Sequence, residues 1–171
     1  MRIPMTFVQE PSCWVNSSLL GIMCLAYRGA YSASKFALEA LSVIMRLELR
    51  GTNIHLALIE PGPITSRFRI NSYAAYKKWI NTEASPQRDT YLRVAARLGG
   101  EKPLPFTLPP EAVLQKVIRV LEVRYPKSRY PVTVPAHLTR WLRRLLPYRL
   151  LNRVAAAMSG GGTRLNLSKT M

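Results

Sequence analysis

The chain has few cysteines and no long apolar run, and both shortages exclude classes of protein. Its two cysteines, Cys13 and Cys24, are too few for a disulfide framework and stand without neighbouring metal ligands, so we expect free thiols and no metal. The longest apolar run, Leu19 to Tyr27, is about half as long as a bilayer crossing. The first residues lack the continuous apolar core of a signal peptide. We therefore expect a cytoplasmic protein.

Acidic residues are scarce as well. Against 25 basic residues the chain has nine acidic ones, a formal net charge of +16, and nearly all of the excess follows Pro61. From His137 onward, leucines and arginines alternate around Pro147, which predicts one or two basic amphipathic helices. Such a face can rest peripherally on an anionic membrane, or it can pack its leucines on the body of the protein. Nucleic acid is not an expected partner, because no zinc-finger, helix-turn-helix or RNA-binding signature is present.

A helix is predicted to begin near Gly29, because Ala30 to Arg50 contains no Gly or Pro and its apolar residues recur at helical spacing. Tyr31 then lies in the first turn, and Lys35 lies one turn later on the same face. The Lys35 ammonium and the positive helix N-terminus both favour the phenolate of Tyr31. This arrangement suits proton transfer to or from a substrate oxygen. The pair is also common on ordinary helix surfaces, so it does not decide the function alone.

Further features surround the pair. Ser18 follows the β-prone Trp14-Val15 and precedes Tyr31 by thirteen residues, and the predicted strand 54–59 leads into the turn 60–63, Glu-Pro-Gly-Pro. With these features the chain resembles the short-chain dehydrogenase/reductase family, in which a Ser, a Tyr thirteen residues on and a Lys four beyond precede a strand that ends in a Pro-Gly turn. The sequence Phe-Ala-Leu-Glu at 36–39 and the turn are most similar to the retinol- and hydroxysteroid-dehydrogenase-like branches. The resemblance covers 15–69 and is looser as far as 134.

The resemblance implies a catalytic role for each matching residue. Tyr31 would be the general acid and base, Lys35 would hold the ribose hydroxyls of NAD or NADP, and Ser18 would bind the oxygen of an alcohol or ketone substrate. Ser17 is the alternative to Ser18, since either hydroxyl could bond the turn, and the thirteen-residue spacing favours Ser18.

The same resemblance implies cofactor contacts in the turn. The backbone of Pro61, Gly62 and Ile64 would meet the nicotinamide carboxamide, with Ile64 offering its N–H. The family then has a Thr four residues after the Gly. Here Ser66 stands at that position and Thr65 precedes it, so either hydroxyl could serve.

The family's glycine-rich strand-turn-helix, which holds the pyrophosphate, has no counterpart in this sequence. The glycines at 160–162 have neither a strand before them nor a helical pattern after them. We therefore expect an α/β chain that forms the C-terminal part of a doubly wound, Rossmann-type parallel sheet, with about three strands, and that lacks the first cofactor-binding half. Cofactor binding by such a truncated chain would be impaired, and its open sheet edge would favour homo-oligomers.

The expected order is strand, helix, strand, helical insertion, helix and strand, which gives parallel strands joined by crossovers. In the insertion, Tyr73, Tyr76 and Trp79 form an aromatic stripe that suits either an apolar substrate or core packing. The final strand is predicted at 130–134. The expected segments are a disordered leader at 1–13, a catalytic half-domain at 14–135, a basic helical segment at 136–158 and a flexible tail at 159–171.

The sequence leaves two functions open. The first is an NAD(P)-dependent oxidoreductase acting on an apolar alcohol or ketone. The second is a non-catalytic basic fragment that associates with a membrane surface, nucleic acid or a partner subunit.

Overall fold

The structure is a computed structural model that describes residues 11–100 and 104–159. The expected tail, apart from Ser159, and most of the expected leader lie outside these residues. The described chain forms two compact units. The first combines the segments up to Gly62 and from Glu111 onward, and the second is Pro63–Pro110.

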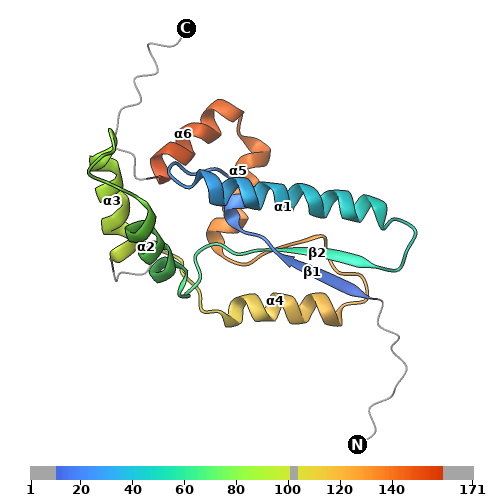
Figure 1. The fold of residues 1–171 in the computed structure, drawn as a ribbon. Coiled ribbons are helices and arrows are strands. Elements are labelled where there is room, and N and C mark those ends of the chain that lie inside the picture. Colours follow the sequence, from blue (N-terminus) through green and yellow to red (C-terminus); the bar gives the residue numbers. More distant parts are fainter. Residues whose placement is uncertain (1–10, 101–103, 160–171) are drawn as a thin grey trace, which may run out of the picture. The chain divides into compact units, whose positions relative to one another are not determined.

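The first unit is built on three parallel strands in the order β1-β2-β3 (Figure 1). These are β1 (Ser12–Asn16), β2 (His55–Glu60) and β3 (Arg129–Pro131). Strand β2 is apolar and almost wholly buried, as a central parallel strand must be. The expected three-stranded parallel sheet of an α/β fold is thus confirmed, and β1 begins inside the range assigned to the leader.

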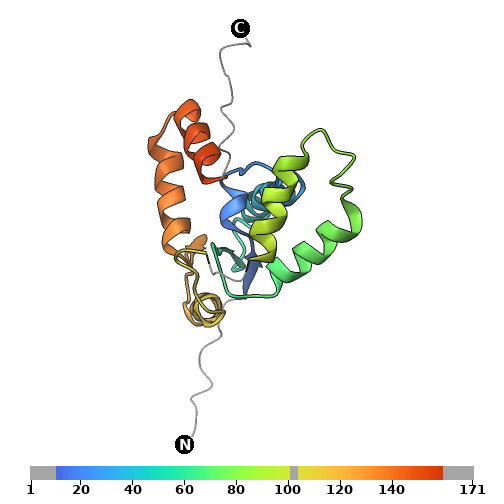
Figure 2. The same ribbon diagram turned by 90° about the vertical axis from the view of Figure 1, so that its left-hand side faces the viewer.

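Helices cover both faces of this sheet. Helix α1 (Gly29–Glu48) packs on one face and α4 (Glu111–Glu122) on the other (Figure 1). After β3 the chain forms α5 (Val134–Leu145) and α6 (Tyr148–Met158), which meet at Pro147 as a hairpin (Figure 2). A single 3₁₀ turn, η1 (Leu19–Gly21), follows β1. The α1 and α4 predictions and the two basic helices are confirmed.

The last strand is shorter than predicted. Pro131 has no N–H to donate to a ladder, and the last bond to β2 runs from the Val132 N–H to the Glu60 carbonyl at 3.3 Å. Thr133 then precedes helix α5, which has Pro135 in its first turn, where proline favours a helix start. The strand predicted over 130–134 was therefore wrong at its C-terminal end.

The second unit is a helical hairpin of α2 (Phe68–Trp79) and α3 (Arg88–Gly99). The rings of Tyr73 and Tyr76 lie nearly parallel with centroids 6.4 Å apart, and Tyr76 also contacts Tyr91 of α3 at 6.3 Å. Trp79 is 75% exposed. Of the two interpretations of the aromatic stripe, packing holds for the tyrosines. No helix among the described residues is long and apolar enough to cross a membrane.

Candidate functional site

The ladder between β1 and β2 continues beyond the strands themselves. The Ser17 N–H donates to the Ile59 carbonyl and the Leu19 N–H donates to the Pro61 carbonyl, both at 2.8 Å. These two bonds hold Ser18 beside the start of the Pro61-Gly62 turn. In an open parallel sheet, the carboxyl ends of the strands are where ligands bind.

Helix α1 brings Tyr31 and Lys35 to the same sheet edge. The Lys35 ammonium donates to the carbonyl of Asn16, the last residue of β1, at 3.0 Å. It lies 5.8 Å from the centroid of the Tyr31 ring, so the two side chains are neighbours, as the i, i+4 spacing predicts. Both side chains are half-buried. Ser34 in the same turn donates its hydroxyl to the Tyr31 carbonyl at 2.7 Å.

The structure separates the two serines after β1. Ser17 is buried, and its hydroxyl donates to a carboxylate oxygen of Glu39. Ser18 is half-buried, and its hydroxyl only accepts the Leu20 N–H at 3.2 Å, as the N-cap of η1. In that contact the Ser18 hydroxyl is the acceptor, so it leaves the Ser18 proton available for donation to a substrate. This geometry favours Ser18 over Ser17 as the substrate-binding hydroxyl, which stays a prediction.

The turn after β2 requires glycine. A Cβ atom on Gly62 would lie far inside van der Waals contact with the buried Thr133 hydroxyl. Because α5 starts from Thr133, this close approach fixes the turn against the beginning of that helix. The Pro61-Gly62 backbone consequently has a defined place beside Ser18.

Two of the expected cofactor contacts belong to the second unit. Ile64 forms a parallel bridge with Leu108, in which the Leu108 N–H donates to Pro63 and the Thr65 N–H donates to Leu108. In such a bridge the N–H of Ile64 itself points away from the Leu108 strand. The Ser66 hydroxyl accepts the Phe68 N–H at the start of α2, at 3.4 Å. The choice between Thr65 and Ser66 stays open.

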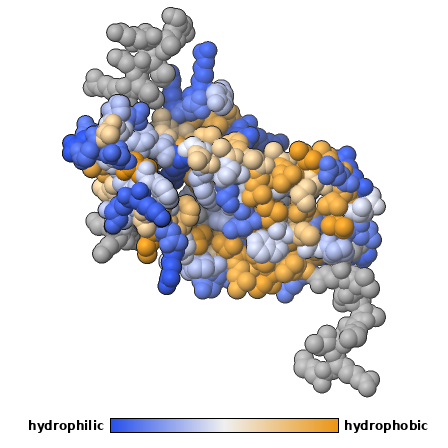
Figure 3. Space-filling view, viewed as in Figure 1, coloured by the Kyte–Doolittle hydropathy of each residue, from blue (hydrophilic) through white to orange (hydrophobic). Residues whose placement is uncertain are grey.

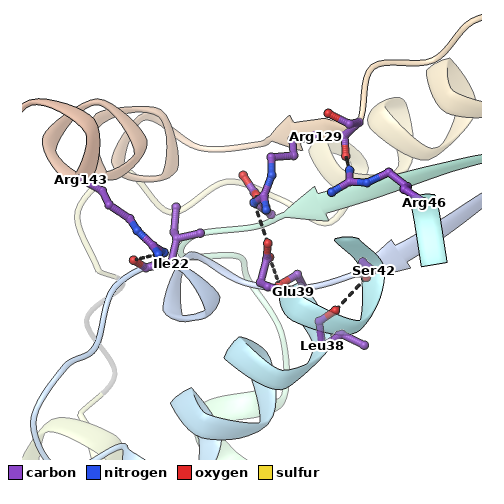
Figure 4. Close-up of polar contacts among 10 residues, drawn as sticks. Ile22, Leu38, Glu39, Ser42, Arg46, Arg129 and Arg143 are labelled. Carbon is purple, nitrogen blue, oxygen red and sulfur yellow. Dashed lines mark hydrogen bonds and ion pairs between the residues drawn. The ribbon is translucent and has the colours of Figure 1, made fainter. Parts of the chain in front are cut away.

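A cluster of charged side chains, which the sequence does not reveal, stabilises the first unit. Arg129 of β3 donates to Glu39 of α1 at 2.6 Å and also to Glu60 of β2 (Figure 4). Burial raises the pKa of the Glu60 carboxyl, and the Arg129 charge acts in the opposite direction. The partners are 69 and 90 residues apart in the sequence, so no local pattern could have revealed them. This cluster, with Ser17, holds α1 on the sheet and so positions Tyr31.

Comparison with known families agrees with this geometry. Residues 15–77 match the short chain dehydrogenase family, a range that contains Ser18, Tyr31, Lys35 and the Pro61-Gly62 turn. Over these residues the chain is similar to the short-chain dehydrogenases/reductases.

Individual relatives extend the match. The uncharacterized oxidoreductase YbbO of Escherichia coli is 41% identical over 82% of this chain and 46% of its own length. The NADPH-dependent 3-dehydrocapnine reductase of Ornithobacterium rhinotracheale is 30% identical over 81% of this chain and 47% of its own. The chain thus spans about half the length of the curated relatives it matches.

A solved structure has a similar fold. The short chain dehydrogenase of Mycobacterium paratuberculosis, bound to NAD, superposes with a TM-score of 0.50 and 21% identity, over 75% of this chain and 45% of its own. The retinol and hydroxysteroid branches are more distant than expected. Human retinol dehydrogenase 8 is 28% identical over 67% of this chain.

Proposed function

We propose that this chain carries the catalytic centre of an NAD(P)-dependent short-chain dehydrogenase/reductase that interconverts an alcohol and a ketone. The observation that carries the proposal is the bond from Lys35 to the Asn16 carbonyl. It fixes the Tyr31-Lys35 pair at the sheet edge where Ser18 and the Pro61-Gly62 turn also lie. In this proposal the three strands are the C-terminal part of a doubly wound sheet.

The three side chains divide the work of the reaction. In the reducing direction, the Ser18 hydroxyl donates a hydrogen bond to the substrate carbonyl oxygen. Tyr31 donates its phenolic proton to that oxygen as a general acid, and in the oxidising direction its phenolate takes the proton back. The Lys35 ammonium lies 5.8 Å from the centroid of the Tyr31 ring and so places a positive charge beside the proton donor. A bound nicotinamide cofactor supplies or accepts the hydride.

The chemistry of the donors fits part of that cofactor. An ammonium has three N–H donors, and the Asn16 carbonyl takes one from Lys35, so Lys35 can also donate to vicinal ribose hydroxyls. The Ile64 N–H and the backbone at Pro61 and Gly62 would serve the carboxamide, and Ser66 or Thr65 would supply a hydroxyl. A helix N-terminus with a glycine-rich turn for the pyrophosphate does not occur in 11–100 or 104–159.

An apolar substrate is the proposed class. The supporting observation is the exposed Trp79 at the end of α2, which offers aromatic surface. One relative is named for retinol, which is an apolar alcohol, and this agrees with the proposed class.

Replacing the phenolic proton donor tests the proposal. We expect Tyr31→Phe to lower ketone reduction by about 10²–10⁴-fold, because general acid catalysis is lost. Tyr27→Phe is the matched control, since Tyr27 lies in the loop before α1 and is 47% exposed. The assay follows NADPH or NADH oxidation over a series of apolar ketones. Turnover of Tyr31→Phe within tenfold of the unmodified chain would remove Tyr31 from the catalytic role.

A further inference from the structure

A basic groove lies on the first unit, between α4, β3 and α5. Its volume is about 730 Å³, which is in the range of small-molecule sites. Among the described residues, no acidic side chain lines it. The groove is lined by six cationic side chains, which are Lys116, Arg119, Lys127, Arg129, Arg140 and Arg144.

Only one of these six cations takes part in an ion pair between described residues, and that one is Arg129. The other five bring charges of one sign into one concave surface. Such a surface concentrates the positive potential and attracts anions from solution. Arginine is also the side chain best suited to phosphate, because its planar fork can donate two parallel hydrogen bonds.

The helix that forms one wall of the groove has an exposed apolar stripe. Val134, Leu138, Trp141 and Leu145 recur at i, i+4, i+7 and i+11 on α5, and each is between 56% and 70% exposed. Trp141 belongs to both features, since it also lines the groove. Two arginines of the groove each directly precede a residue of the stripe in the sequence, Arg140 before Trp141 and Arg144 before Leu145.

The outward direction of this stripe follows from the packing of the opposite face. Ala136 and Thr139 are buried on that face. Arg143 donates to the Ile22 carbonyl at 3.1 Å (Figure 4). Its guanidinium also lies 5.8 Å from the ring of Phe36, and the two contacts hold α5 against η1 and α1. Because the packed face contains these residues, the leucines and the tryptophan remain outside.

We propose that the basic groove and the α5 stripe together dock on a membrane surface that contains anionic phospholipids. The lipid phosphates occupy the groove, and Leu138, Trp141 and Leu145 enter the boundary between headgroups and acyl chains, where tryptophan is favoured. Nucleic acid offers phosphates but no apolar partner for the stripe. A second copy of this face has the same positive charge and would repel the first.

Flotation with vesicles tests the docking, because bound protein floats while aggregated protein sediments. The full chain is mixed with vesicles of phosphatidylcholine alone or of phosphatidylcholine with phosphatidylglycerol. We expect flotation only with the anionic vesicles, and a decrease as salt screens the charges. Equal flotation with both vesicles would overturn the proposal, as would none with either.

Paired variants locate the contact. Arg140→Gln with Arg144→Gln should lower the vesicle partition coefficient about 25-fold, since each basic residue near an anionic surface contributes about fivefold. The control is Arg50→Gln with Arg93→Gln, which removes the same charge from exposed positions outside the groove. An equal loss in both pairs would mean that only net charge matters, and this would overturn the assignment to the groove.

Fluorescence tests the depth of the stripe. With Trp14→Phe and Trp79→Phe, Trp141 becomes the single tryptophan, and its emission should shift to the blue on anionic vesicles. Trp141→Ala should weaken flotation about tenfold or more, because a large apolar side chain no longer enters the membrane. Trp79→Ala, at a residue that is also largely exposed, should not weaken it. If a DNA duplex displaces the protein from vesicles at equal phosphate concentration, or if the emission does not shift, the lipid assignment is wrong.

Discussion

Arg129 belongs to two charged regions, one in which the charges are paired and one in which most of them are not. On one side it meets the carboxylates of Glu39 and Glu60, and these charges are buried and paired. On the other side it lines a groove whose remaining cations have no ion pair among the described residues. A buried charge needs its partner to keep the fold, whereas exposed cations gathered without partners indicate something outside the chain.

The apolar side chains also fall into two groups, those buried inside the fold and those exposed on its surface. The sheet interior buries Leu58 and Ile59 completely, while helix α1 exposes Leu41, Ile44 and Leu47 by about half. Hydrophobic surface extends over α1 and along α4 on the face shown in Figure 3. We therefore expect the paired regions to contribute stability, and we propose that partners bind at the unpaired regions.

The largest effect is expected from breaking the paired cluster. Arg129→Leu leaves two buried carboxylates without their cation, which costs about 3–5 kcal/mol of unfolding free energy. The cost should be greater at pH 8 than at pH 5, because Glu60 can take up a proton in acid. Chemical denaturation at both pH values measures it. Arg144→Leu, from the same groove, is the control, because Arg144 has no ion pair among the described residues. A loss above about 0.5 kcal/mol there would contradict the comparison.

Substitutions on the exposed face of α1 should change the stability less but should clearly change the oligomeric state. We propose that its exposed stripe and the edge of β1, where no other described strand pairs and Trp14 is 42% exposed, make the chain a homo-oligomer. Leu41→Gln with Leu47→Gln should shift the mass at micromolar concentration toward the 19.3 kDa monomer. Size-exclusion chromatography with light scattering measures the mass, with Leu92→Gln of α3 as control. A monomeric, cooperatively melting unmodified chain would contradict this.

The smallest effect is the pH dependence from Glu60. Burial raises its folded pKa above the unfolded value, so the folded state binds this proton more tightly. The stability from this group is full below the unfolded pKa and is lost as the pH rises through the folded pKa. Glu60→Gln does not titrate and should flatten that decline, whereas the exposed Glu83→Gln should not. Denaturation midpoints over the acidic range measure the slope, and a parallel slope in Glu60→Gln would exclude Glu60 as its cause.

Local features of the fold were predictable from the sequence. Helix α1 and the neighbouring Tyr31 and Lys35 follow from an uninterrupted helical pattern, since i, i+4 side chains meet wherever a helix forms. The three parallel strands follow from three β-prone segments that are joined by two crossovers.

Features that depend on tertiary contact were not predictable. In the sequence, nothing distinguishes Arg129 from the other basic residues of its region. Only the folded sheet brings it to Glu39 and Glu60. The thirteen-residue spacing favours Ser18 over Ser17, but only the structure shows that the Ser17 hydroxyl is bound to Glu39. The exposed stripe on α5 needed the packing of Arg143, because periodicity alone does not say which face of an amphipathic helix is covered.

Cofactor binding by the chain and by its Lys35 variant tests the proposed function most directly. Isothermal titration with NADPH and NADH at up to millimolar concentration should show binding of one of them. Lys35→Met should weaken it, and Tyr31→Phe should leave it nearly unchanged, because Lys35 is assigned to the ribose and Tyr31 to the substrate proton. A thermal melt of Lys35→Met controls for lost folding. No binding at millimolar cofactor, or equal dissociation constants in a folded Lys35→Met variant, would contradict the proposed function.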